Sequence, residues 1–214
     1  KLIAGMLRPE HILDIIRHFT LYQQVSGRTV KVVCRYQQFR AVQASVQRLL
    51  KGKTRLQDGE HDRRGGVVWH TQGSGKSLTM VFLMRKLRSL PQLRRFKVVI
   101  VTDRKDLQDQ LSETAELTGE TVTVAGSIDS VKQLLAVHGP GIVFATIQKY
   151  AGRDEADPNG EAPGELGVLN EDESVLVMVD EAHRSHSSGL HGSLLKALPN
   201  AARIGFTGTP CIMG

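Results

Sequence analysis

Residues 66–80 read Gly66-Val67-Val68-Trp69-His70-Thr71-Gln72-Gly73-Ser74-Gly75-Lys76-Ser77-Leu78-Thr79-Met80, and this stretch decides the fold. The apolar, β-favouring residues 67–69 predict a strand, and the helix formers of residues 77–90 predict a helix that ends before Pro91. Gly73 and Gly75 between them allow a tight loop. Such a loop points backbone N–H groups inward at the positive end of a helix dipole, where phosphate oxygens bind.

The loop also carries side chains suited to a nucleotide. Lys76 is placed to reach the outer phosphates, and the Ser77 hydroxyl to hold a magnesium ion. The usual spacing G-x-x-x-x-G-K-[ST] is incomplete, because His70 stands where the first glycine belongs. A glycine-rich surface turn before a helix is therefore the alternative, and the surrounding sequence must decide.

Composition bounds the class of protein. With 214 residues, 40% of them hydrophobic, the chain can bury the core of one domain. Its 28 Lys and Arg against 22 Asp and Glu give a formal charge of +6, which suits a polyanionic partner. Only Cys34 and Cys211 are present, so we expect no disulfide framework and a reducing, cytoplasmic setting. No apolar run is long enough to predict a membrane span.

The segment before the loop predicts two helices and one short strand. Pro9 favours a helix start, and an apolar face follows at Ile12, Ile15, Ile16 and Phe19. After Gly27 come a β-like run at residues 30–33 and a second helix at residues 36–50. A basic stretch with a glycine follows, and we interpret it as a solvated loop that carries Lys51, Lys53, Arg55, Arg63 and Arg64.

From Gly66 onward the chain alternates between strands and helices, which predicts an α/β fold with a mostly parallel sheet and helices on both faces. We expect the strands at residues 67–69, 97–102, 121–124, 142–146, 175–179 and 203–206. Apolar spacing predicts helices around residues 107–115, 128–135 and 190–198. Residues 151–174 interrupt the alternation with eight acidic residues and four glycines, and we expect an exposed loop there.

Two further groups of polar residues follow predicted strands. Asp180 and Glu181 come directly after the apolar strand at residues 175–179, where open α/β sheets bind ligands. Asp180 is suited to hold magnesium, and Glu181 to activate the water that attacks the γ-phosphate. Paired acids that cap a helix are the alternative. After the strand at residues 203–206, the turn at residues 207–210 offers Thr207 and Thr209 as a relay that senses the γ-phosphate.

These motifs carry a family resemblance. Together, residues 73–77, 180–183 and 207–210 resemble motifs I, II and III of superfamily 2 helicases and translocases. The closer similarity is to the motor subunit of type I restriction enzymes, in which His at the place of His70 is ordinary. It rests on five stretches: Arg35-Tyr36-Gln37-Gln38-Phe39-Arg40-Ala41-Val42, Trp69-His70-Thr71-Gln72-Gly73-Ser74-Gly75-Lys76-Ser77, Val101-Thr102-Asp103-Arg104-Lys105-Asp106-Leu107, Ala145-Thr146-Ile147-Gln148-Lys149 and Asp180-Glu181-Ala182-His183-Arg184-Ser185.

The resemblance implies an ATP-driven double-stranded DNA translocase built on a RecA-like P-loop NTPase domain, with ATP and Mg²⁺ as cofactors. It implies that Gln38 reads the adenine edge with Tyr36 near the base, and that His183 acts beside the acidic pair. The other implied nucleotide contacts are Thr71, Gly73, Ser74, Gly75, Lys76, Ser77, Thr207 and Thr209. The implied DNA contacts are Arg104, Lys105, Thr146, Gln148 and Lys149.

The resemblance also implies partners: a second RecA-like domain that supplies an arginine finger, and the modification and specificity subunits of a restriction complex.

The chain begins at a lysine and ends just after a motif, so we expect a piece of a longer polypeptide. We expect residues 1–31 to be a helical linker from a preceding domain, and residues 32–214 to form the first RecA-like motor domain. We find no Asp…Glu-x-Lys nuclease pattern.

Other functions remain open at this point. The chain could belong to another superfamily 2 helicase or remodelling motor, or be a nucleotide-binding, DNA-binding module without turnover. A small-molecule kinase would not explain the carboxylate pair followed by a histidine. A GTPase is disfavoured because no Asn-Lys-x-Asp stretch follows a strand to read guanine.

Overall fold

The computed structural model describes residues 5–71, 73–102, 108–109, 112, 122–146, 166–180 and 189–208. Six parallel strands form one sheet in the order β3-β8-β7-β4-β6-β5. They are β3 (Gly66–Trp69), β4 (Lys97–Thr102), β5 (Val122–Ala125), β6 (Gly141–Thr146), β7 (Val175–Asp180) and β8 (Ala202–Thr207). All six predicted strands are confirmed, with each end within one residue of its prediction.

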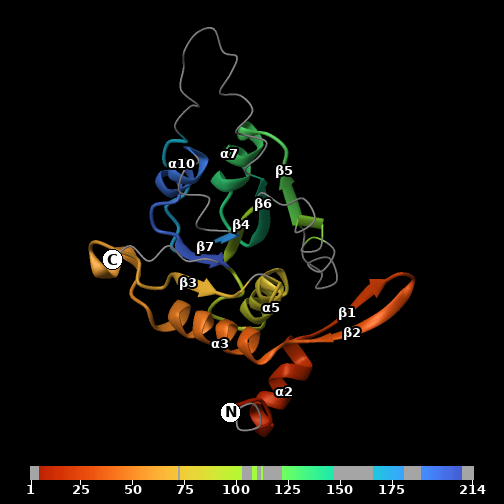
Figure 1. The fold of residues 1–214 in the computed structure, drawn as a ribbon. Helices are drawn as coiled ribbons and strands as arrows, with labels where there is room; N and C mark the ends of the chain where they lie inside the picture. The colour runs from red at the N-terminus through yellow and green to blue at the C-terminus, as the bar shows by residue number, and fades with distance from the viewer. Residues whose placement is uncertain are drawn as a thin grey trace.

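Helices cover both faces of this sheet (Figure 1). On one face lie α3 (Tyr36–Lys51) and α5 (Lys76–Ser89), and on the other lie α7 (Ile128–Ala136) and α10 (Gly189–Ala197). Because side chains alternate along a strand, Val98 and Ile100 of β4 join the core under α3 and α5. Val99 and Val101 join the core under α7 and α10. The predicted α/β architecture is therefore confirmed.

Helix α5 packs beside α3 on the same face of the sheet and is apolar on most sides. Five consecutive residues, Met80, Val81, Phe82, Leu83 and Met84, are buried, as is Leu87 one turn later. A helix that is hydrophobic all round belongs inside a domain. The loop at its N-terminus is thus anchored to the centre of the core.

The N-terminal part contains a helix and a hairpin that the sequence only partly predicted. Helix α2 (Pro9–His18) starts at Pro9 as expected. The antiparallel strands β1 (Thr20–Val25) and β2 (Arg28–Val33) follow it. Their turn is Ser26-Gly27, with φ of 52° and 76°, the two positive values that a two-residue hairpin turn of type I′ requires. The predicted run at residues 30–33 is part of β2, whereas the sequence pattern did not predict β1.

Helix α2 packs on the core of the domain through fewer residues than predicted. Ile15 and Phe19 are buried, but Ile12 and Ile16 are exposed, so the predicted apolar face is wrong for those two. The Phe19 ring lies 5.0 Å from the Phe39 ring and 5.6 Å from the Phe82 ring, centroid to centroid. The segment expected to be a linker thus shares its core with α3 and α5, while the domain boundary at residue 31 stays a prediction.

The basic stretch after α3 is not all solvated loop. It contains the short helix α4 (Arg55–Asp58), and Arg64 is buried. The Arg64 guanidinium donates to both carboxylate oxygens of Asp62 and to the carbonyls of Glu173 and Asn200. Arg64 is therefore a structural residue, because a buried guanidinium is stable only when its donors are satisfied.

The acidic segment at residues 151–174 is not wholly an exposed loop either. Its described part, residues 166–174, has no helix or strand, but Leu166 and Asn170 are buried. The Asn170 amide donates to the Leu135 carbonyl at 3.0 Å, and the backbone N–H of Leu169 donates to the Ala197 carbonyl at 2.9 Å. This part ties α7 to α10. Residues 151–165, most of the predicted helix at 107–115 and the end of the chain after 208 lie outside the described residues.

No helix within the described ranges is both long and apolar enough to span a membrane.

Candidate functional site

The site is built where three neighbouring strands end. In the sheet, β8 lies between β3 and β7, and the register aligns Trp69 with Thr207 and Asp180 with Phe206. The backbone N–H of His70 continues the ladder by donating to the Thr207 carbonyl at 3.0 Å. The carboxyl ends of parallel strands share one edge, so the glycine loop, Thr207 and Asp180 meet there. Asp180 and Thr207 are both buried.

The loop between β3 and α5 has the geometry that its glycines predict. Gly73 and Gly75 have φ of 74° and 82°, in the left-handed region. The Ser74 N–H donates to the Thr71 carbonyl at 3.1 Å, which closes a turn. The Gly75 carbonyl accepts from both the backbone N–H and the hydroxyl of Thr79. Helix α5 therefore begins at Lys76, and the backbone N–H groups of its first turn face the loop.

Gln38 of α3 holds this loop from the side. Its side-chain N–H₂ donates to the Gly75 carbonyl at 2.9 Å and to the Ser74 carbonyl at 3.4 Å. Its side-chain oxygen accepts from the Arg35 N–H at 2.7 Å. The amide is buried and has partners on both sides. Gln38 thus joins the start of α3 to the phosphate loop, a contact that sequence spacing could not predict.

His70 occupies the place of the missing first glycine and is buried. Burial lowers the pKa of its imidazole, the hydrogen bond to the Gln37 backbone opposes this shift, and the charge of Lys76 adds to it. The net direction is downward, so the ring is neutral near pH 7. Its Nδ1 atom has no hydrogen-bond partner among the described residues.

The loop fits a phosphate group. The Ser74 hydroxyl is buried in it without a hydrogen-bond partner in the described part of the chain. Buried polar atoms normally have a partner, and a phosphate oxygen is a suitable one here. The described residues contain no group of three metal-binding side chains. A magnesium ion at a phosphate loop needs none, because phosphate oxygens and water fill most of its coordination sphere.

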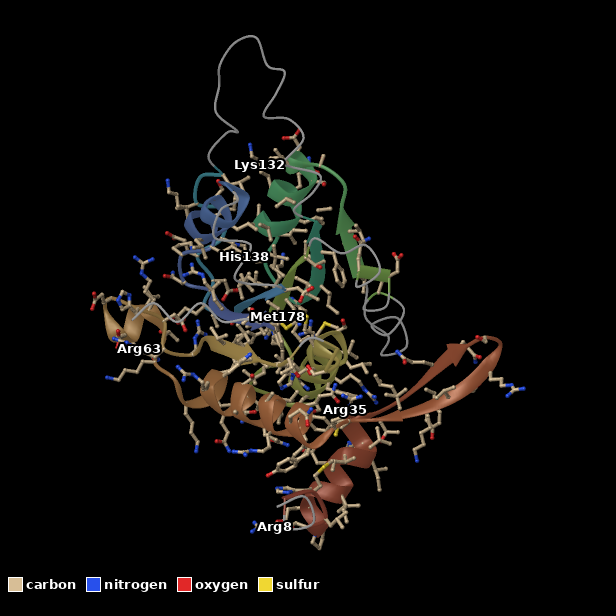
Figure 2. All side chains as sticks on the ribbon, in the orientation of Figure 1. Arg8, Arg35, Arg63, Lys132, His138 and Met178 are labelled. Atoms are coloured by element: carbon tan, nitrogen blue, oxygen red, sulfur yellow. The ribbon has the colours of Figure 1, made fainter. Side chains whose placement is uncertain are left out.

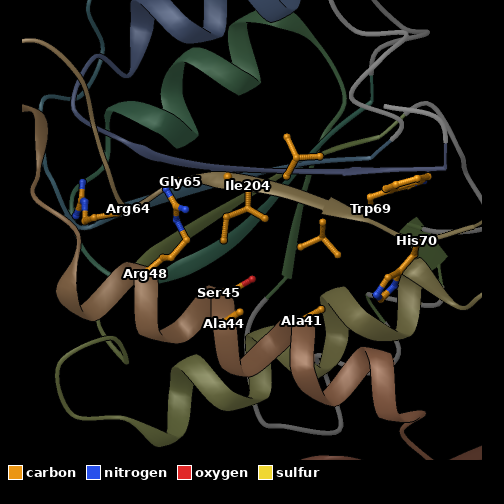
Figure 3. Close-up of a pocket in the computed structure, with 12 residues that line it drawn as sticks. Ala41, Ala44, Ser45, Arg48, Arg64, Gly65, Trp69, His70 and Ile204 are labelled. Carbon is orange, nitrogen blue, oxygen red and sulfur yellow. The ribbon is translucent and has the colours of Figure 1, made fainter. Parts of the chain in front are cut away.

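Two hollows lie beside α3. A cavity of about 250 Å³ lies between α3 and β3, with His70 at one end and Arg48 and Arg64 at the other (Figure 3). It is smaller than ordinary ligand pockets. A second cavity, of about 470 Å³, lies between the N-terminal segment and α3, and its lining is Gly5, Arg8, His11, Tyr36, Phe39, Arg40, Gln43, Ala44 and Gln47. The Arg40 guanidinium carbon lies 5.7 Å from the centre of the Tyr36 ring.

The structure brings together part of the predicted site. Gln38, Thr71, the loop at residues 73–77, Asp180 and Thr207 all lie at one sheet edge or contact it. Thr146 ends β6, which is separated from β7 by β4. The other predicted residues lie outside the described part of the chain: Arg104, Lys105, Gln148, Lys149, Glu181, His183 and Thr209.

A parallel sheet whose first strand leads through a glycine loop into a buried helix, with a carboxylate at the end of a nearby strand, defines a RecA-like P-loop nucleotide-binding domain. Within that class, the chain belongs to the SWI2/SNF2 ATPase family, whose model matches residues 37–214.

The relatives agree with the resemblance seen in the motifs. The HindI endonuclease subunit of a Haemophilus influenzae type I restriction enzyme is 38% identical over 98% of this chain and 21% of its own length. The putative MjaIXP endonuclease subunit of Methanocaldococcus jannaschii is 34% identical over 98% of this chain and 19% of its own. The chain therefore spans about a fifth of these relatives.

A solved structure of the Sulfolobus solfataricus SWI2/SNF2 ATPase core in complex with dsDNA is 16% identical, with a TM-score of 0.49. The matched region covers 88% of this chain and 34% of the solved chain.

Proposed function

We propose that this chain is the ATP-binding half of an ATP-dependent double-stranded DNA translocase of a type I restriction endonuclease. The observation that carries the proposal is the alignment of β3, β8 and β7, which brings the phosphate loop, Thr207 and Asp180 to one edge. Relatives named as type I restriction endonuclease subunits support the restriction role. DNA cleavage would come from parts of the enzyme other than these residues.

In this proposal the loop binds ATP through its backbone N–H groups, and Lys76 pairs with the outer phosphates. Ser77 and Asp180 would hold Mg²⁺, which would neutralise charge on the phosphates. Glu181 orients and deprotonates the attacking water, and His183 with Thr207 and Thr209 relays the state of the γ-phosphate. The arginine that completes the site comes from a second RecA-like domain.

The base of ATP would lie beside the start of α3, because Gln38 of this helix contacts the loop that is proposed to hold the phosphates. We propose that Tyr36 packs near the base and that Gln38 contributes to adenine recognition.

The DNA track is proposed to run along the segments that follow β4 and β6. Arg104, Lys105, Thr146, Gln148 and Lys149 would contact its backbone. Modification and specificity subunits are the proposed protein partners.

The test is ATP binding and DNA-stimulated ATP hydrolysis in the longer polypeptide that carries the proposed second RecA-like domain, with Lys76→Ala as the variant. Lys132→Ala is the matched control, because Lys132 lies on α7, on the sheet face opposite α5 (Figure 2). Lys76→Ala should abolish hydrolysis, while Lys132→Ala should keep wild-type rates.

Wild-type protein that binds no ATP at millimolar concentration would refute the nucleotide site. ATP binding without any hydrolysis in the presence of DNA would point instead to a nucleotide-binding module without turnover.

A further inference from the structure

The positive charge of this chain is concentrated in its N-terminal quarter. Residues 15–57 contain no Asp or Glu and nine cationic residues, so the rest of the chain carries a formal charge of −3. The nine cations are Arg17, Arg28, Lys31, Arg35, Arg40, Arg48, Lys51, Lys53 and Arg55. A block of one sign on one part of a domain is the electrostatic footprint of a polyanion-binding surface.

The β1–β2 hairpin presents part of this charge on a projecting ribbon (Figure 1). Arg28 directly follows the turn. Lys31 pairs across the strands with Tyr22, so Lys31 and Tyr22 share one face of the ribbon, and Arg28 lies on the other face. Arg28 and Lys31 are exposed, and Tyr22 is 59% exposed. Neither cation has an ion-pair partner within the described residues.

The base of the ribbon is fixed to the motor core. Leu21 is buried, and the Cys34 N–H donates to the Phe19 carbonyl at 3.0 Å. From α5, the Arg85 guanidinium donates to the Thr20 carbonyl at 2.5 Å. Because an isolated two-stranded hairpin is marginal in water, these contacts decide its direction. The helix that begins at the phosphate loop therefore also positions the ribbon.

We propose that the β1–β2 ribbon is a second contact for duplex DNA, separate from the segments after β4 and β6. Arg28 and Lys31 would pair with phosphates from the two faces of the ribbon, and the Tyr22 hydroxyl would donate to the backbone that Lys31 contacts. A two-stranded ribbon is narrow enough to lie in the major groove. The surface continues along α3 from Arg35, which Figure 2 shows where the ribbon meets the helix. This inference rests on the proposed function.

Nucleic acid suits this ribbon better than an acidic protein surface does. Its other polar side chains include Gln24 and Thr29, which hydrogen-bond each other at 2.9 Å on the face of Tyr22 and Lys31. Amides, hydroxyls, a phenol and cations without any carboxylate form the usual set for phosphate and sugar contacts. Charge neutralisation by phosphates has a clear signature, since each released counterion makes binding more sensitive to salt.

The experiment measures binding of the full chain to a fluorescent 30-base-pair duplex between 50 and 200 mM salt. The variant is Arg28→Ser with Lys31→Ser. The matched control is Arg94→Ser with Arg95→Ser, which removes the same charge from an exposed turn after α5. Losing two phosphate contacts should lower the slope of log affinity against log salt by roughly 1.8 and weaken binding about tenfold at 150 mM. The DNA affinity of the control should differ from that of wild type by less than about twofold.

Three outcomes would overturn the ribbon proposal. If both double variants bind DNA like wild type, or lose affinity equally, the ribbon has no specific role. If the ribbon variant keeps DNA affinity but loses a co-purifying subunit, the ribbon is a protein-binding surface. If wild type hydrolyses ATP but binds no duplex at all, the DNA part of the proposed function fails as well. Unchanged thermal melting of both double variants excludes a folding defect, because the replaced side chains are exposed.

Discussion

The side-chain N–H₂ of Gln38 lies 2.9 Å from the Gly75 carbonyl, and this contact joins two parts of the chain that are far apart in sequence. A Cβ added at Gly75 would lie 2.6 Å from the Gln38 nitrogen. The start of α3 and the phosphate loop are thus fitted to each other, and a change on either side should disturb the nucleotide site.

Gln38→Ala should weaken ATP binding about tenfold and lower the free energy of unfolding by about 2 kcal/mol. It leaves the Arg35 N–H without its partner and removes one of the donors to the Gly75 carbonyl, and an unpaired buried group costs about 1–3 kcal/mol. Isothermal titration and urea unfolding measure the two effects. Gln37→Ala is the control, since Gln37 is exposed. Unaltered ATP affinity would contradict the role in the loop, and an unaltered preference for ATP over GTP would contradict adenine recognition.

Gly75→Ala should cost about 3 kcal/mol of stability, whereas Gly59→Ala should cost only about 1 kcal/mol. Both glycines have positive φ, at 82° and 86°, so backbone strain is common to the two variants. Only the methyl group at Gly75 meets another atom, because nothing lies within 4 Å of a Cβ at Gly59. Thermal unfolding compares them. Equal losses would mean that the Gln38 contact does not limit the size of residue 75.

Glu181→Gln should leave ATP bound but reduce steady-state hydrolysis by about a hundredfold to a thousandfold. The amide keeps the shape of the side chain and cannot accept a proton from water. Glu181 follows Asp180 at the end of β7, although it lies outside the described residues. Titration and a phosphate-release assay measure the two effects. Near-normal turnover in this variant would give Glu181 another role.

Asp14→Asn should lower the free energy of unfolding by about 2 kcal/mol at pH 7, because one carboxylate connects three helices. Asp14 on α2 accepts from Lys86 of α5 at 2.5 Å, from Gln43 of α3 at 2.6 Å and contacts His18 at 2.6 Å. The control is Asp58→Asn, because Asp58 bonds to Arg63 and to the His61 N–H, which lie a few residues along the chain, and this local pair should contribute less. If both variants lose a similar free energy of unfolding, the contacts of Asp14 with α2, α3 and α5 do not make a special contribution to stability.

The contacts of Asp14 also predict that the stability of the protein depends on pH. Burial would raise the pKa of Asp14, but hydrogen bonds from Lys86 and His18, the charge of Lys86 and a hydrogen bond from Gln43 outweigh it, and the pKa is lowered. A lowered carboxyl pKa gives stability that is complete above the unfolded value of 3.8 and is lost as pH falls through the folded value. The difference between wild type and Asp14→Asn should therefore shrink below about pH 4, and a constant difference down to pH 2 would contradict this account.

The sequence by itself determined the sheet and the phosphate loop. Strands buried on both faces are unbroken apolar runs, as in residues 97–102 and 175–179, so their positions could be predicted from composition alone. Gly73 and Gly75 could be assigned because positive φ restricts the choice of residue. The place of Asp180 followed from the rule that ligands bind at the carboxyl ends of strands.

Only the tertiary structure decided the partners of the isolated polar residues. The strand order alone brings Thr207 beside Trp69, and packing of α3 on α5 alone brings Gln38 to Gly75. Arg64 was predicted to be solvated and is buried, because its three groups of partners come from residues 62, 173 and 200. Local patterns describe the neighbours of a residue along the chain, whereas burial of a charged or polar side chain depends on partners that folding brings from a distance.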